Sequence, residues 1–438
     1  MRRTCAFLFH TVALTICFAL CACGSDSGAP VAKDAATTEA GQNDLPTNTG
    51  IDGGLAGIDG GLTNHVGIAV VNSDYTSTSV SFLDRDGNLV HDGCFNSGTG
   101  APSLAVTLSG DVVLPSQVQP GGPVTIVDRG NGTLTWLDPA TCTPLRQLAV
   151  STGYLAYPHD MVLVSATKAY VTRYEKNSAA TPEAADFDDG NDLLVIDPSQ
   201  PKILGRIDLT PFAPAGVLPR ADRALMAEGV VFVSLNAISG NFQTYGTGRI
   251  VMVNPTTDVV TGAIDIPVAK NCGAMTYLPA EKKLMVACGG DFSNPAQQID
   301  SSAIVVIDLS VSPPAVVAQI AATSVGASPF SNLSLAAWDG NTVLGLTLGD
   351  ASKSTQDQLW ALPLAGALHV KVFESSEAWA LGSVLADPQK GRIFAADATT
   401  MTGAFLRVFA VAAGAFTPSK TVKTNPAQKL PPRALAWY

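Results

Sequence analysis

A short strand-like segment that ends in Asp or Asn recurs along most of this chain. Each copy is largely apolar and is often followed by Pro and two small polar residues. The copies are SFLDRDG, LTWLDPAT, LLVIDPSQ, IVMVNPTT and IVVIDLSV, with weaker copies LWALPLAG and RVFAVAAG. Their end positions are spaced by 54, 59, 57, 54 and 55 residues: Asp84, Asp138, Asp197, Asn254, Asp308 and Pro363. Such an interval is too short for a separate domain and fits a four-stranded unit with its loops.

Further strand-like segments surround each copy. A segment that is apolar nearly throughout precedes it, such as ATKAYVTRY or AEGVVFVSL, and another lies before that one, such as HDMVLVS or ADRALMA. In the second unit we assign PSLAVTL as the first strand and SGDVVLPS as the second. A fourth strand such as KILGRIDL follows the Asp-Pro turn. Seven copies of this four-stranded antiparallel unit predict an all-β fold, a seven-bladed β-propeller.

The two ends of residues 66–438 complement each other. The segment HVGIAVVNSDY resembles a second strand with no first strand before it, whereas the terminal PPRALAWY matches first strands such as NLSLAAW. We therefore expect the C-terminal strand to join the first blade and close the ring, which leaves no exposed sheet edge. The alternative, an outer-membrane barrel that ends in an aromatic residue, requires longer alternating strands than these.

Residues 1–22 are typical of an export signal, because Arg2 and Arg3 precede the apolar stretch Thr4–Ala19. The end of this stretch, Leu-Cys-Ala-Cys, resembles the lipobox of bacterial lipoproteins, which implies acylation of Cys23. Gly24 follows, which by the same resemblance favours the outer membrane of a bacterial cell envelope, on its periplasmic or surface side. An ordinary signal peptide or an uncleaved anchor is the alternative.

Residues 23–65 contain almost no large apolar residues, and the sequence IDGGL occurs in them twice. Such a segment cannot bury enough apolar surface to offset its chain entropy, so we expect a flexible tether between the lipidated Cys23 and the propeller. Removing Arg2 and Arg3 with the signal changes the net charge from −11 to −13. Since no basic cluster remains, the composition argues against a nucleic-acid partner.

Four cysteines remain beyond Cys23, and an exported protein meets an oxidising environment. Cys272 and Cys288 are equidistant from Ala280, the centre of a predicted hairpin turn, so an antiparallel pair places them opposite each other. We expect a disulfide there and a second one between Cys94 and Cys142. The alternative is that all four are small buried hydrophobic residues.

Two stretches resemble the YVTN-type propeller repeat. They are PSLAVTLSGDVVLPS (102–116) and ATKAYVTRYEK (166–176), the latter with the Tyr-Val-Thr core at Tyr170, Val171 and Thr172. With the Asp-Pro turns, the resemblance covers nearly all of residues 66–438. It implies the propeller fold and, by analogy with envelope relatives, a binding or scaffold role rather than one particular activity. Only one copy retains Tyr-Val-Thr.

The predicted connections differ in length in a way that points to one face. Turns between first and second strands and between third and fourth strands are short, whereas the other two classes of connection are long and share a face of a propeller. Because long loops on a rigid scaffold often carry function, we expect the binding site there. The candidate ligand-binding residues are His159, Asp160, Arg173, Tyr174, Tyr245 and Asp291. For Arg173 and Tyr174, pairing with Asp186 or Asp188 is the alternative.

The sharpest local feature of this face is DFDDGND (186–192). Its carboxylates, Asp186, Asp188, Asp189 and Asp192, are candidate ligands for Ca²⁺, which takes six to eight oxygens. However, the glycine lies one position early for an EF-hand loop and the closing glutamate is missing, so a solvated acidic loop tip is the alternative. No other cofactor is indicated.

The sequence contains no GxSxG, HExxH, P-loop or dinucleotide motif, so no catalytic residue is assigned. We expect a lipid-anchored binding or protein-interaction module for an envelope protein or an extracellular ligand. The alternative is a hydrolase or lyase with a site on the long-loop face, and a third is a purely structural envelope component. Convergent carboxylates and a histidine in one pocket favour the enzyme; a broad uncharged surface favours the binder.

Overall fold

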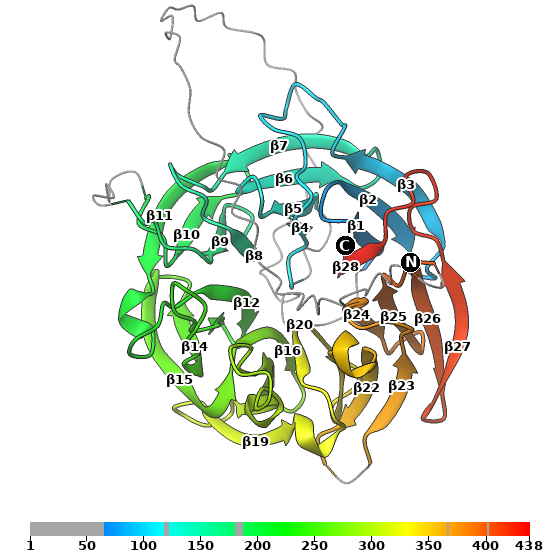
Figure 1. Cartoon of the computed structure of the whole chain (residues 1–438). Helices are drawn as coiled ribbons and strands as arrows, with labels where there is room; N and C mark the ends of the chain where they lie inside the picture. The colour runs from blue at the N-terminus through cyan, green and yellow to red at the C-terminus, as the bar shows by residue number, and fades with distance from the viewer. Residues whose placement is uncertain (1–64, 118–121, 180–186, 366–367, 401–402) are drawn as a thin grey trace, which may run out of the picture. The chain divides into compact units, whose positions relative to one another are not determined.

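The computed structural model describes residues 65–117, 122–179, 187–365, 368–400 and 403–438. The export signal and almost all of the tether, Cys23 included, lie outside these residues. The described chain forms seven four-stranded antiparallel sheets arranged as blades around a central channel (Figure 1). The predicted seven-bladed β-propeller is therefore confirmed.

Within each blade the strands follow chain order from the innermost to the outermost, except that the C-terminal strand is the innermost strand of blade 1. Blade 1 contains β28 (Pro432–Trp437), β1 (Gly67–Ser73), β2 (Thr78–Asp84) and β3 (Leu89–Asn96). Blade 2 contains β4 (Val112–Val113), β5 (Val124–Asp128), β6 (Thr133–Asp138) and β7 (Thr143–Ala149). Blade 3 contains β8 (Pro158–Ser165), β9 (Lys168–Arg173), β10 (Asp192–Asp197) and β11 (Lys202–Asp208). Blade 4 contains β12 (Ala221–Ala227), β13 (Val230–Leu235), β14 (Thr247–Asn254) and β15 (Val259–Lys270).

The remaining blades follow the same order. Blade 5 contains β16 (Cys272–Leu278), β17 (Lys283–Gly289), β18 (Ser302–Asp308) and β19 (Ala315–Ala321). Blade 6 contains β20 (Phe330–Ala337), β21 (Thr342–Thr347), β22 (Gln358–Pro363) and β23 (Val370–Glu374). Blade 7 contains β24 (Leu381–Asp387), β25 (Arg392–Asp397), β26 (Phe405–Ala412) and β27 (Ala415–Val422). Single 3₁₀ turns lie at η3 (Thr210–Phe212), η4 (Ile299–Ser301), η5 (Ala322–Ser324) and η6 (Ala351–Lys353). No described helix is long and apolar enough to cross a membrane.

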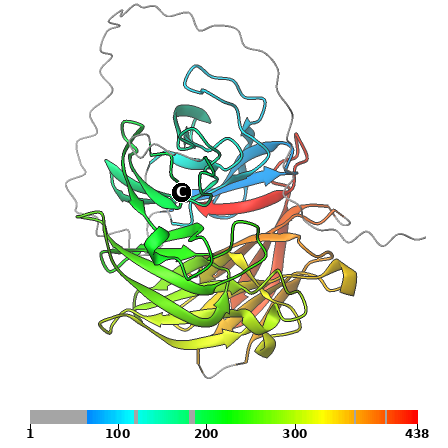
Figure 2. The same ribbon diagram turned by 60° about the vertical axis from the view of Figure 1, so that its left-hand side comes forward.

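Ring closure occurs as predicted. Strand β28 pairs antiparallel with β1, with Ile68 opposite Trp437 and Val71 opposite Ala434. Figure 2 shows the red C-terminal strand lying beside the blue strands of the first blade. The ring of Tyr438 packs edge-on against Phe82 with centroids 5.2 Å apart. The terminal aromatic residues are thus packing residues of the first blade.

The second blade differs from the prediction. Residues 102–108 form no strand, and Val112–Val113, assigned as part of the second strand, is the innermost strand β4. The second strand is β5 (Val124–Asp128), which forms a tight hairpin with β6 in which Asp128 is opposite Thr133. Strand β5 is short and follows a Pro- and Gly-rich stretch, so the earlier apolar segment resembled a second strand more closely.

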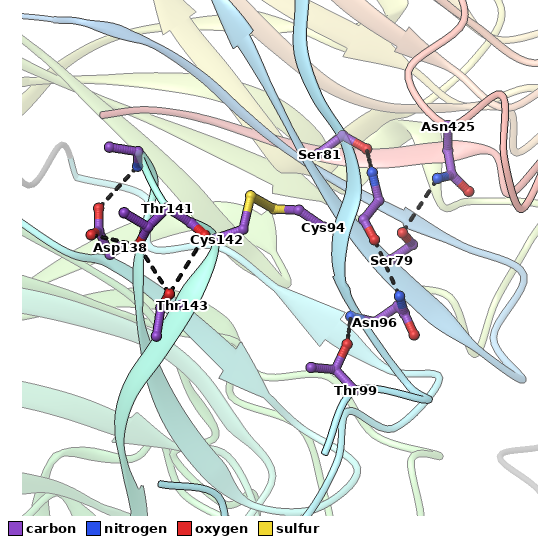
Figure 3. The surroundings of a disulfide bond; sticks show 12 residues. Ser79, Ser81, Cys94, Asn96, Thr99, Asp138, Thr141, Cys142, Thr143 and Asn425 are labelled. Carbon is purple, nitrogen blue, oxygen red and sulfur yellow. Dashed lines mark hydrogen bonds between the residues drawn. A yellow bond between two sulfur atoms is a disulfide. The ribbon is translucent and has the colours of Figure 1, made fainter. Parts of the chain in front are cut away.

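Both predicted disulfides are present. Cys272 and Cys288 are direct cross-strand partners in β16 and β17, with Cα atoms 3.9 Å apart. Cys94 in β3 is bonded to Cys142 in the turn between β6 and β7, which ties blade 1 to blade 2 (Figure 3). The first bond therefore acts within a blade and the second between neighbouring blades.

Candidate functional site

The innermost strands of all seven blades begin on one face of the ring. The connection from β9 to β10 and the connections that lead into β8 and β12 lie on this face, which we call the long-loop face. The opposite face, at the turns that end the innermost strands, is the short-turn face. Every innermost strand begins on the long-loop face, so the first residues of these strands surround the axis of the ring there (Figure 1). We call this region the channel mouth.

A histidine and an aspartate from neighbouring blades meet at this mouth. His159, the second residue of β8, places its Nδ1 2.7 Å from the Oδ1 atom of Asp222, the second residue of β12. Asn236 donates to the other Asp222 oxygen at 3.1 Å. The Tyr174 ring stacks on the imidazole with centroids 4.2 Å apart. The Nε2 atom of His159 makes no hydrogen bond to the described residues.

Burial and neighbouring charges determine the protonation of this pair. Burial lowers the pKa of His159, and the positive charges of Arg129 and Arg223 lower it further, against the raising effect of Asp222. For Asp222, burial raises the pKa, but the hydrogen bond and charge of His159 and the charge of Arg223 lower it overall. At neutral pH we therefore infer an ionised Asp222 that accepts the Nδ1 proton of a neutral imidazole, which leaves Nε2 as an acceptor.

A second charged pair comes from blade 2. Asp111 precedes β4 and accepts a 2.9 Å hydrogen bond from Nε of Arg129. The hydroxyl of Tyr157 donates to the other Asp111 oxygen at 2.7 Å. The Arg129 guanidinium lies 5.8 Å from the centroid of the Tyr157 ring. This group therefore links blade 2 to the residues that precede β8.

A third pair lies towards blade 4. Arg220 is buried and stands 4.9 Å from the Tyr174 ring centroid and 4.0 Å from that of Phe242. Its Nη1 atom donates to Glu175 at 2.5 Å. Cation–π contact and a carboxylate partner together offset the cost of burying this guanidinium. We call the whole group the polar sector: Asp111, Arg129, Tyr157, His159, Tyr174, Glu175, Arg220 and Asp222.

Asp160 is one of the predicted binding residues, and the structure places it inside the protein. Its carboxylate is fully buried and accepts backbone hydrogen bonds from Ser116 at 2.8 Å, Met161 at 2.8 Å and Ala224 at 3.0 Å. Burial raises the pKa of this carboxyl group. Asp160 joins blades 2, 3 and 4 and does not face the channel mouth as an open ligand group.

Among the described residues Arg173 pairs with Asp192 and not with Asp188, and Asp186 lies outside these residues. Arg173 is fully buried, and its Nε and Nη2 atoms donate to the two oxygens of Asp192 at 2.6 and 2.5 Å. It also donates to the carbonyl of Phe187 at 2.6 Å. This fork closes the base of the long connection between β9 and β10, so Arg173 supports the loop from below.

The carboxylates of the acidic loop are placed differently from one another. Asp192 is buried with Arg173, and Asp189 forms an ion pair with Arg206. One oxygen of Asp188 is buried without a hydrogen-bond partner in the described residues, and Asp186 lies outside them. Within the described chain no group of three or more His, Cys, Asp or Glu side chains is arranged to hold a metal ion. The Ca²⁺ hypothesis is untested for the complete loop.

Tyr245 and Asp291 lie beside the polar sector over blades 4 and 5. Asp291 accepts a 2.9 Å hydrogen bond from Nζ of Lys270. Burial raises the pKa of Tyr245, and the negative charge of Asp291 raises it further, whereas Arg220 lowers it. These two predicted residues are therefore electrostatic neighbours, as His159 and Tyr174 are stacking neighbours.

Aromatic side chains occupy another part of the same mouth. Trp379 precedes β24 and its ring lies 6.3 Å from that of Phe292, which belongs to the connection between β17 and β18. Arg433 at the start of β28 lies 4.9 Å from the ring centroid of Tyr75, in the connection between β1 and β2. We call these four residues the aromatic sector: Tyr75, Phe292, Trp379 and Arg433.

The sequence prediction missed most of these residues, including Asp111, Arg129, Arg220 and Asp222. A usable signal existed, because Asp222 occupies the same position in its innermost strand as His159 does in the preceding blade. Aligning the units by their first strands would have placed the two side chains on one face in neighbouring blades.

The short-turn face has hollows of another character. One, of about 610 Å³, lies between blades 1 and 2 and is lined mainly by apolar side chains such as Val66, Val90 and Leu145. Another, of about 290 Å³, lies where several innermost strands end on the short-turn face, and its lining includes Met226 and Trp437. Charged and aromatic groups with open hydrogen-bonding atoms gather on the long-loop face instead, which makes that face the candidate site.

The fold places the chain among seven-bladed β-propellers. A protein from Lactobacillus plantarum matches with a TM-score of 0.56 at 11% sequence identity, covering 85% of this chain and 99% of that one. A Bacteroides fragilis protein with the provisional description 6-phosphogluconolactonase matches with a TM-score of 0.54 at 11% identity, covering 86% and 98%. The propeller domain of Cps50 (Swd1) from Myceliophteria thermophila gives 0.52 at 10% identity, covering 80% and 97%.

At these identities the likeness shows the fold alone, and fold does not determine function. No family model matches the chain, and no curated protein matches it in sequence. The function therefore has to be argued from the side chains at the channel mouth.

Proposed function

We propose that this protein is an envelope binding module that takes its ligand at the channel mouth of the long-loop face. One observation carries the proposal: side chains from neighbouring blades converge there and are already held in place by partners within the protein. His159 is fixed by Asp222 and Tyr174, and Arg220 by Glu175. Such preorganisation reduces the entropy that a ligand loses on binding and is typical of a recognition surface.

The N-terminal features extend this proposal to the location. Acylation of Cys23 would anchor the protein to the outer membrane, and residues 23–65 would act as the tether. The partner is then an envelope protein or an extracellular ligand rather than a nucleic acid, which fits the net charge of −11. Ca²⁺ is retained only as an option for the acidic loop.

Photo-crosslinking of the full-length lipoprotein in intact envelopes tests the proposed face. The photoreactive residue replaces Leu155, which is 50% exposed in the connection before β8 on the long-loop face. The matched control replaces Leu368, which is 88% exposed between β22 and β23 on the short-turn face. A defined adduct at position 155 and none at 368 supports the proposal. Adducts confined to position 368 contradict it.

The pair of His159 and Asp222 favours a second candidate, a hydrolase or lyase. A neutral imidazole oriented by a carboxylate, with an open Nε2, is the arrangement of a general base. The provisional lactonase description belongs to the Bacteroides fragilis protein and guides only the choice of substrates. If this candidate is correct, hydrolysis of lactones or esters by the purified protein falls by about 10²-fold or more in His159→Gln and in Asp222→Asn. Equal rates in wild type and both variants exclude it.

A further inference from the structure

Arg433 is an arginine of the channel mouth that has no carboxylate partner among the described residues. Its Nε donates to the carbonyl of Ser73 at 3.3 Å and its Nη1 to the carbonyl of Trp379 at 3.4 Å. Its Nη2 makes no hydrogen bond to the described residues. Arg433 is half-buried, so this guanidinium is held in one place while part of its donor edge stays open.

Ion pairing separates Arg433 from nearly all other described arginines. All of them except Arg146 and Arg433 form an ion pair with a carboxylate. Arg146 lies on the outermost strand β7, donates to the carbonyl of Pro198 and stacks on Trp136. Arg433 is therefore an unpaired cation at the mouth of a protein whose net charge is −11, and a carboxylate is its natural complement.

Two open aromatic side chains stand beside this cation. Tyr75 is 64% exposed although its ring contacts the guanidinium, so most of the ring faces solvent. Trp379 is 46% exposed. The buried carboxylate of Asp357 fixes the Trp379 backbone, because it accepts the amides of Trp379 at 2.9 Å and Leu381 at 2.8 Å. The backbone of Trp379 is thus fixed, and both side chains offer apolar surface to a ligand.

Hydrogen-bonding groups follow directly along the rim. Tyr75 packs against Gly110, where an added Cβ would lie 2.3 Å from the Tyr75 carbonyl oxygen, so only glycine permits this approach. The next residue is Asp111, which is hydrogen-bonded to Tyr157. A ligand that lies on Tyr75 can therefore extend towards Asp111 and Tyr157, which can hydrogen-bond to hydroxyl groups. An apolar or aromatic acid carries no hydroxyl groups to make these hydrogen bonds.

We propose that Arg433, Tyr75 and Trp379 form a binding subsite for a sugar that carries a carboxylate, such as a uronic acid. The carboxylate binds the open edge of the Arg433 guanidinium, the apolar face of the pyranose ring packs on an aromatic ring, and the hydroxyls point towards the polar sector. This inference rests on the proposed function, because it names the ligand class of the same mouth.

Titration of the purified full-length protein with methyl glucuronide, followed by ligand-observed NMR, tests the subsite. Methyl glucoside removes the carboxylate and acetate removes the ring, so both should bind at least about tenfold more weakly. Arg433→Gln should weaken glucuronide binding by about tenfold or more, and Trp379→Ala and Tyr75→Ala severalfold. Arg146→Gln, the matched control, should bind as the wild type does.

The inference is overturned if methyl glucuronide does not bind, if the glucoside or acetate binds equally well, or if Arg433→Gln binds unchanged. Thermal unfolding of each variant confirms that it is folded before its binding is compared. Crosslinking at position 155 is independent of this titration. An adduct there without glucuronide binding overturns only the ligand class, whereas glucuronide binding lost in Arg433→Gln supports the subsite even where no adduct forms.

Discussion

The polar sector and the aromatic sector occupy the same channel mouth, yet their arginines have different partners. In the polar sector each arginine has a carboxylate partner, as Arg129 has Asp111 and Arg220 has Glu175. In the aromatic sector Arg433 has only backbone carbonyls and the face of Tyr75. The first arrangement fixes the geometry of the mouth, and the second leaves a cation available to a ligand.

This difference teaches which side chains are constrained by folding and which by recognition. A buried charge must be paired for the protein to fold, whereas a half-exposed cation costs little to leave unpaired. Substitutions in and beneath the polar sector should therefore act on stability, and those in the aromatic sector on binding. Four substitutions test this division, from the largest expected effect to the smallest.

The largest loss of stability should follow Arg173→Met, beneath the polar sector. The substitution removes the two short hydrogen bonds of a fully buried carboxylate, Asp192, which keeps only its 3.4 Å contact with Arg206. It should lower the free energy of unfolding by about 3 kcal/mol. Urea denaturation measures the change. Arg433→Met is the control and should cost less than about 1 kcal/mol. Similar losses in the two variants would remove the distinction between the sectors.

A smaller loss should follow Asp222→Asn within the polar sector. The change removes a charged acceptor from His159 and Asn236, and hydrogen bonds to charged groups are worth about 1.5–3 kcal/mol. Asp265→Asn is a suitable control, because Asp265 pairs with Arg249 on an exposed strand surface and should change stability by less than about 0.5 kcal/mol. Equal denaturation midpoints for the two variants would show that Asp222 has no structural role.

The pH dependence should also separate the sectors. Burial lowers the pKa of His159, so the folded state disfavours the imidazolium; the associated stability is complete above pH 6.5 and is lost as the pH falls below it. His159→Phe should therefore flatten the decrease in melting temperature between neutral and mildly acidic pH. Some slope should remain, because burial and Arg85 lower the pKa of His65 to about 4. Arg433→Gln should keep the wild-type slope, and an unchanged slope in His159→Phe would refute the assignment.

The smallest effect on stability should follow Tyr75→Ala. The side chain is mostly exposed, and surface substitutions usually change the free energy of unfolding by about 0.5 kcal/mol or less. Methyl glucuronide binding should nevertheless weaken severalfold. A melting temperature that falls as far as that of Asp222→Asn would mean that Tyr75 is part of the fold rather than of a recognition surface.

The sequence predicted the fold well because a propeller repeats one local pattern. The Asp-Pro turns located the third strands, and the match between PPRALAWY and other first strands predicted ring closure by β28. The prediction failed in blade 2, where β5 lies after a Pro- and Gly-rich stretch and β4 has only two residues. Local propensity cannot separate such strands, because pairing across the sheet defines them.

The candidate site was predicted only in part, for a related reason. His159 and Tyr174 belong to one blade, and their location on the long-loop face followed from loop lengths. The hydrogen-bond partner that orients the His159 imidazole comes from another blade, because Asp222 lies 63 residues from His159 in the sequence. Arg173 appeared from its place beside the loop to be a ligand group, but its burial with Asp192 depends on packing that a linear pattern does not encode.

The order in which the strands are synthesised gives the Cys94–Cys142 bond a second meaning. Strand β1 is the first strand of the propeller to be synthesised and its inner partner β28 is the last. The first blade is therefore incomplete until the strands of every other blade have been synthesised. An unfinished sheet edge invites pairing with a wrong strand. The disulfide attaches the outer strand of this blade to blade 2, its immediate successor. In the folded ring it therefore holds against blade 2 the one sheet whose innermost strand comes from the other end of the propeller sequence.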